Sequence, residues 1–197
     1  MTQAIFGLIG VFVGGLLTWF RDAWSDGRTL KRHARYLAIR VVCVLDKYVQ
    51  DCADVATDDG LCQGQRNERG YLEAQVSKPP PPTFPQDLDW KSIDHELTYR
   101  LFSLQNESEA ADRMISFASE NAFPPDFEEV FEERQYQYAM LGLAAFALTQ
   151  ELRDKYTISA RTPGEWNPVE KLREAKNEVD KYRRDRMQRL TAGPSLI

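Results

Sequence analysis

The sequence predicts a mostly α-helical chain: an N-terminal transmembrane helix, then a helical-bundle-like cytoplasmic domain with a short irregular or β-hairpin insert and a C-terminal helical arm. Three observations predict this class: an uncharged apolar stretch near the N-terminus, apolar residues spaced three and four apart through most of the remainder, and a Pro-rich interruption between two such stretches. The expected segments, in order, are a short external N-terminus, the transmembrane helix, a basic juxtamembrane segment with a long helix, a loop or small hairpin, a helical core, and a charged helix with its tail: 1–3, 4–20, 21–56, 57–92, 93–158 and 159–197.

Residues 4–20 contain no charged side chain. A helix of this length covers roughly 26 Å, close to a hydrocarbon core of about 30 Å. Residues suited to the membrane interface follow at the end of the stretch: Trp19, Phe20, Arg21 and Trp24. A cleavable leader would carry a basic region before the apolar stretch and a small-residue cleavage site after it, and this sequence has neither. An uncleaved span is therefore expected, with a cleaved leader and a buried or interfacial helix as the alternatives.

Glycines recur along one face of this predicted span, and Gly10 and Gly14 make the spacing that lets two membrane helices approach closely. The proposed packing face consists of Gly7, Gly10, Gly14 and Leu17. Glycine is also common in membrane helices without such a role. The pattern therefore predicts self-association through this face, with simple membrane insertion as the alternative.

Residues 21–40 carry six basic and two acidic side chains. Because basic residues near a span stay on the cytoplasmic side, this excess predicts a single-pass membrane protein with its N-terminus outside and its C-terminal domain in the cytoplasm. Three basic residues lie close enough to the predicted bilayer to contact anionic lipid headgroups: Lys31, Arg32 and Arg35. The alternative is that the same charges serve only to stop transfer of the chain.

Helical periodicity dominates the body of the chain. Residues 30–55 are expected to form one long helix, and residues 93–158 the core, with an apolar seam at Tyr138, Leu141, Ala145, Leu148 and Leu152. Residues 57–92 contain turn formers, four consecutive prolines and one alternating stretch, so a small hairpin and an irregular connection both remain open. Asn167 followed by Pro168 predicts the start of the last helix.

The sequence shows no motif for catalysis, a cofactor or a metal. An acidic cluster at residues 126–133 has the spacing of shared metal ligands but lacks a histidine partner, and the start of a solvated helix explains it better. Residues 41–167 carry 11 basic and 23 acidic side chains, which does not favour nucleic-acid binding. No enzymatic activity is expected.

Three stretches, "RYLAIRVVCVLDKYVQDCADVATDDGLCQG", "DWKSI" and "FEERQYQYAMLGLAA", resemble a group of bacterial and prophage-associated proteins with a short N-terminal span, a helical body and no assigned function. The resemblance covers most of residues 30–150 and implies a bacterial or phage source but no activity. Together with the predicted span, this source implies a location in the bacterial inner membrane.

The sequence therefore predicts a membrane-anchored helical interaction or assembly protein. Its expected partners are the lipid bilayer and either a second copy or another membrane or cytoplasmic protein. One alternative is a small oligomeric membrane-acting effector, such as a pore or holin-like protein. A weaker alternative is an enzyme whose active site follows no motif.

Overall fold

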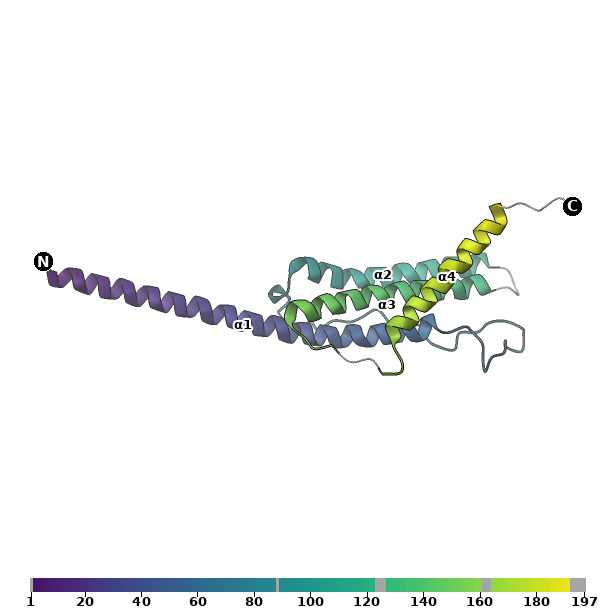
Figure 1. The fold of residues 1–197 in the computed structure, drawn as a ribbon, viewed down its shortest axis with the longest axis horizontal. Helices are drawn as coiled ribbons and strands as arrows, with labels where there is room; N and C mark the ends of the chain where they lie inside the picture. The colour runs from purple at the N-terminus through teal and green to yellow at the C-terminus, as the bar shows by residue number, and fades with distance from the viewer. Residues whose placement is uncertain (1, 88, 123–126, 161–163, 192–197) are drawn as a thin grey trace.

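The computed structural model describes residues 2–87, 89–122, 127–160 and 164–191, with side chains from residue 28 onward. Helix α3 lies at the centre of a helical bundle, because it packs against each of the three other α-helices (Figure 1). The mostly helical, bundle-like part of the predicted fold class is confirmed. The described helices are α1 (Thr2–Ala56), the short 3-10 helix η1 (Trp90–Ser92), α2 (His95–Asn121), α3 (Glu128–Tyr156) and α4 (Pro168–Thr191).

The predicted N-terminal transmembrane helix is the part of the fold class that needs correction. Within the residues searched, which are those the structure describes, none of the helices is both long enough and apolar enough to cross a membrane. The physical reason is that charged residues lie along the described part of each of these helices, and those at Arg134 and Arg153 flank the apolar centre of α3. The predicted span at 4–20 itself falls on residues of α1 whose side chains lie outside the described part.

The segments 4–20 and 21–56, predicted as separate elements, belong to one continuous helix, α1. Its C-terminal half packs against α3 and α4, whereas its N-terminal half extends away from the bundle (Figure 1). Shortly after the helix ends, Gly60 adopts a positive φ of 72°. A side chain at this position would also meet the ring of Phe131 on α3, so glycine serves both the turn and the close approach.

The core follows the spacing that the sequence predicts. On α2, the buried residues recur three and four positions apart: Leu97, Leu101, Leu104, Ser108, Ala111 and Ile115. On α3, the predicted seam is buried at every position: Tyr138, Leu141, Ala145, Leu148 and Leu152. Side chains three and four residues apart lie on one face of a helix, so each stripe faces the interior of the bundle.

Side-chain caps start two of the helices. The carboxylate of Asp94 accepts a hydrogen bond from the backbone N–H of Leu97 at the start of α2. The Asn167 side chain accepts one from the N–H of Val169 at 3.1 Å, and α4 begins at Pro168 as predicted.

The insert between α1 and α2 is irregular, and no strand occurs among its described residues. One isolated antiparallel bridge joins Cys62 and Gln65. The stretch that alternates in the sequence does not pair as a strand because Asp58 accepts the backbone N–H groups of Gln75 and Val76, which a ladder would need. Of the two alternatives for residues 57–92, the structure therefore supports the irregular connection.

Candidate functional site

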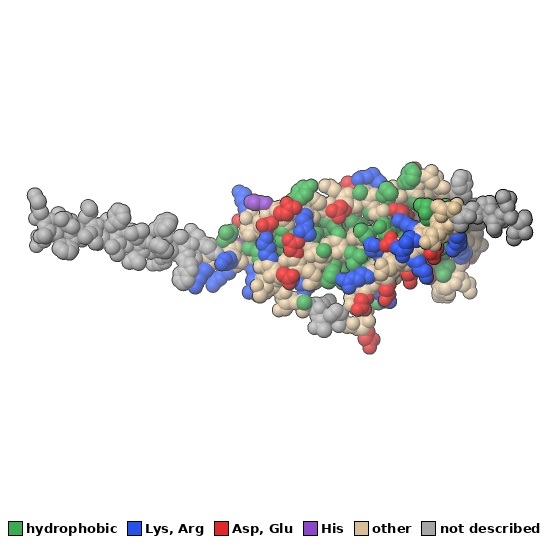
Figure 2. Space-filling view, turned by 45° about the horizontal axis from the view of Figure 1, so that its top comes forward, with side chains coloured by type: hydrophobic (Ala, Val, Ile, Leu, Met, Phe, Trp, Pro, Cys, Tyr) green, Lys and Arg blue, Asp and Glu red, His purple; other side chains and the backbone are tan. Residues whose placement is uncertain are grey.

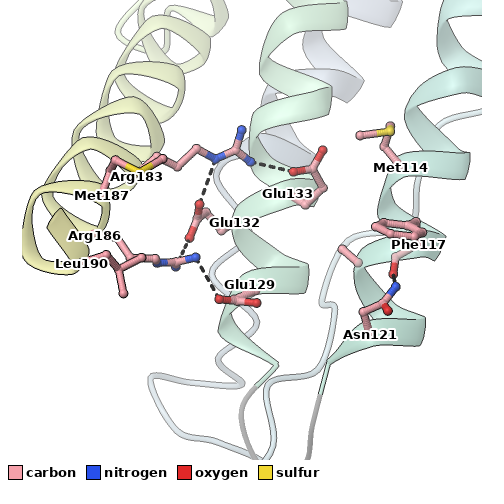
Figure 3. Close-up of a pocket in the computed structure, with 11 residues that line it drawn as sticks. Met114, Phe117, Asn121, Glu129, Glu132, Glu133, Arg183, Arg186, Met187 and Leu190 are labelled. Atoms are coloured by element: carbon pink, nitrogen blue, oxygen red, sulfur yellow. Dashed lines mark hydrogen bonds and ion pairs between the residues drawn. The ribbon is translucent and has the colours of Figure 1, made fainter.

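Three helices enclose a groove at the end of the bundle opposite to the N-terminal half of α1 (Figures 1 and 3). The groove has a volume of about 500 Å³. The residues that line it come from the end of α2, the start of α3 and the end of α4: Met114, Phe117, Ala118, Asn121, Glu129, Glu132, Glu133, Arg183, Arg186, Met187 and Leu190.

The apolar walls of the groove face solvent. Met114 and Phe117 on α2 are 51% and 65% exposed, and Met187 and Leu190 on α4 are 64% and 74% exposed. Large apolar side chains gathered at one exposed place mark binding surfaces more often than scattered ones do. Two of these four side chains are methionines, whose flexible thioethers adapt their shape to different partners.

Polar side chains form the wall between α3 and α4. Arg183 donates to Glu132 at 2.9 Å and to Glu133 at 2.6 Å, while Arg186 donates to Glu129 at 2.9 Å and to Glu132 at 2.6 Å (Figure 3). Glu132 thus joins both arginines, and its side chain is only 11% exposed. The network holds α4 against α3 beyond the last buried apolar residue of α4.

The position of this network follows from the register of α4. The buried face of α4 consists of Leu172, Ala175 and Val179, and Arg183 continues the same spacing one turn later. At that point the neighbouring face of α3 changes from apolar residues to glutamates. The inner contact between the two helices therefore changes from apolar packing to ion pairs.

The ion pairs leave the arginines fully charged. Burial would lower the pKa of Arg183, but the carboxylates of Glu132 and Glu133 outweigh burial and raise its pKa above the usual value. The Arg183 guanidinium also lies 4.4 Å from the centroid of the Tyr136 ring. Charge, hydrogen bonds and ring contact together fix this side chain in place.

The acidic cluster has a role that the sequence did not indicate. Glu129, Glu132 and Glu133 bind arginines of α4, and the side chains of Glu132 and Glu133 are only 11% and 16% exposed. Among the described residues, no group of three or more histidine, cysteine, aspartate or glutamate side chains has an arrangement that could hold a metal ion. The cluster serves as an interhelical ion-pair network.

The buried cysteine is not arranged as a nucleophile. Burial raises the pKa of the Cys52 thiol to about 12, so that the thiolate is scarce near neutral pH. Cys52 is fully enclosed, whereas Cys43 and Cys62 are exposed. The side chain of Cys52 contributes to the core between α1 and α3.

The residues singled out from the sequence lie elsewhere. Lys31, Arg32 and Arg35 are exposed on α1, far from the groove, and Arg35 donates to the backbone oxygen of Thr157 at 3.2 Å. The expected packing face and interface anchors fall on residues whose side chains are outside the described part: Gly7, Gly10, Gly14, Leu17, Trp19, Phe20, Arg21 and Trp24.

Sequence reasoning did not identify the exposed apolar residues Met114 and Phe117 of α2 as candidate site residues. A usable signal was present, because the buried stripe of α2 runs through Ala111 and Ile115. Met114 and Phe117 are out of phase with that stripe. Apolar side chains that a regular stripe leaves over are the ones available for a partner.

Comparison with protein-family models, with curated proteins and with solved structures finds no match for this chain. The resemblance to a bacterial and prophage-associated group stays a prediction. The function of this chain is therefore inferred from the geometry of its helices and of the groove.

Proposed function

We propose that this chain is a non-enzymatic helical interaction or assembly protein, and that the groove between α2, α3 and α4 is its binding surface. The observation that carries the proposal is the grouping of four large exposed apolar side chains along one groove: Met114, Phe117, Met187 and Leu190. An exposed apolar groove beside fixed polar side chains suits an apolar helix face or an extended segment of another chain.

The rest of the site supports binding rather than chemistry. The two arginines in the groove are neutralised by its glutamates, since Arg183 and Arg186 are each held by two carboxylates. They therefore act as a rigid support for α4, and the apolar side chains remain as the surface that gains from contact with a partner. No specific observation in the described part of the chain favours a pore-forming effector or an enzyme, and neither is proposed.

A photoreactive side chain placed in the groove tests this function. Benzoylphenylalanine is incorporated in place of Phe117 in the full-length chain within its native cells, and the products are identified by mass spectrometry after irradiation. We expect adducts with a defined segment of a partner, which can be another protein or a second copy, because Phe117 is 65% exposed on the groove wall.

The matched control replaces Tyr99, which lies on the same helix outside the groove and is 69% exposed. Similar exposure on one helix means that random encounters label both positions to a similar extent. Adducts at residue 117 that do not exceed those at residue 99 would contradict the groove as a binding surface.

A further inference from the structure

We infer that the partner held in the groove is a second copy of this chain, whose α4 enters it while the first copy's α4 enters the groove of the second. This inference rests on the proposed function of the groove and names its occupant. The resulting contact is the same on both copies, so that it closes as a two-fold dimer and leaves no groove open.

The end of α4 has the apolar side chains that such a groove requires. The last part of α4 extends past the other helices (Figure 1), and Met187 and Leu190 are 64% and 74% exposed on its last turns. In the single chain these two side chains line a groove that nothing in the described structure fills. A second α4 lying in the groove would cover its own Leu190 and the exposed Phe117 in one contact.

Charge complementarity favours a second copy over an unrelated partner. The segment 168–197 has 8 basic and 5 acidic residues, whereas residues 41–167 have 11 basic and 23 acidic ones. Lys181 and Arg189 of α4 are exposed and form no ion pair among the described residues. At the end of α2, beside the groove, Glu120 is exposed and has no ion pair within the described part of the chain. The groove itself is lined by three glutamates and two arginines, which leaves one net negative charge. The chain thus carries both a basic helix and the acidic rim that suits it.

The arginines already in the groove do not oppose the approach of this basic helix. Arg183 and Arg186 are each bound by two carboxylates, and Glu132 is shared by both. Their positive charge is therefore compensated within one copy. Lys181 and Arg189 of α4 and Glu120 of α2 lie outside this network, and their opposite charges attract one another between two copies.

Disulfide formation between two differently tagged copies tests whether α4 of one copy lies in the groove of the other. Both full-length copies carry C43S and C62S, which remove the exposed thiols, and one copy adds L190C while the other adds F117C. Since each copy holds only one introduced thiol, a disulfide that joins the two tags requires α4 of one copy at the groove of the other. We expect this product in high yield under mild oxidation, and a several-fold lower yield when Y99C replaces F117C. Equal disulfide yields from F117C and Y99C would contradict this placement of α4.

The mass of the full-length chain provides the second measurement. We expect a dimer by analytical ultracentrifugation in mild detergent, and a shift toward monomer for L190E, while Y99E stays dimeric. Leu190 is 74% exposed, so its replacement should leave the helix content unchanged by circular dichroism. A monomeric wild-type chain, or a dimer that L190E leaves unchanged, would overturn the inference.

The two proposals fail in different ways. Photoadducts at residue 117 with another protein, together with a monomeric full-length chain, would overturn the second copy as occupant and retain the groove as a binding surface. Background labelling at residue 117 would overturn both. Adducts with a second copy that map to α4 support both.

Discussion

At the residue scale, a buried ion pair joins the end of α1, the insert and α3. Asp58 accepts hydrogen bonds from the N–H groups of Gly60, Gln75 and Val76 and from Arg134 Nη1 at 2.9 Å. The side chains of Asp58 and Arg134 are 1% and 6% exposed. Removal of one partner would leave the other charged and buried without compensation.

We predict that D58A lowers the free energy of unfolding by about 3–5 kcal/mol, the usual cost of breaking a buried ion pair. The measurement is urea unfolding followed by circular dichroism. D59A is the matched control, because the neighbouring Asp59 is exposed and accepts only the N–H of Leu61. A loss for D58A no larger than that for D59A would contradict the structural role of the pair.

The same residue predicts a dependence on pH. Burial by itself would raise the pKa of Asp58, but the N–H groups of Val76 and Gly60 and the Arg134 guanidinium lower it below the usual 3.8. The stability from Asp58 is therefore fully present above 3.8 and is lost as the pH falls through the lower folded-state pKa. Wild type should lose more stability than D58A on acidification across this range, as urea unfolding at a series of pH values measures. If wild type and D58A lose the same unfolding free energy over this pH range, Asp58 is not the titrating group.

At the element scale, one glycine allows α4 to lie close to α3. A Cβ atom on Gly142 would come within 2.7 Å of Leu172 Cδ1 and 3.0 Å of Cys52 Cβ. Leu172 is fully buried, so its side chain has little free space into which to move. Helices α1, α3 and α4 meet at this position. The close packing of α4 against α3 therefore depends on the absence of a side chain at Gly142.

We predict that G142A destabilises the bundle, because overpacking costs about 1–3 kcal/mol and the gain in helix propensity offsets only about 1 kcal/mol of it. G164A is the control, since nothing lies within 4 Å of a Cβ atom there. In the background of L172A, G142A should cost less, and a double-mutant cycle by urea unfolding measures that difference. Equal costs in both backgrounds would show that Leu172 is not the obstacle.

At the scale of the whole molecule, charge is divided along the chain. Residues 21–40 are basic, residues 41–167 are acidic, and the segment that contains α4 is basic again. Figure 2 shows basic side chains gathered where the described surface meets the grey N-terminal part. Lys31 and Arg32 lie exposed in this region. Their contact with anionic lipid headgroups stays a prediction, as does a location at the bacterial inner membrane.

For this region we predict that the full-length chain binds vesicles of phosphatidylglycerol and phosphatidylcholine more tightly than vesicles of phosphatidylcholine alone. Reversal of Lys31 and Arg32 to glutamate should weaken the preference at least several-fold, because each basic residue near an anionic surface contributes about 1 kcal/mol. Vesicle sedimentation measures it, and reversal of Lys181 and Arg184 on α4 is the control. If the chain with Lys31 and Arg32 reversed still prefers the anionic vesicles, this region is not the contact. The same follows if only the reversal of Lys181 and Arg184 removes the preference.

The sequence by itself determined the helices and their inner faces. The seam from Tyr138 to Leu152 and the start of α4 at Pro168 were both predictable, because helical spacing and capping depend on residues a few positions apart. The transmembrane part of the predicted fold class was wrong for the structure as described. Charged residues lie along the described part of each helix, and none of these helices is apolar enough over the length of a span.

Only the tertiary structure decided where the groove lies and what forms it. Arg183 and Glu132 are 51 residues apart, and nothing local in the sequence indicates that their helices meet. The same holds for Asp58 and Arg134, whose pairing leaves the insert irregular. Helical periodicity shows which side chains share a face, whereas the crossing of helices, set by close approaches such as that at Gly142, determines which faces meet and which apolar side chains stay uncovered.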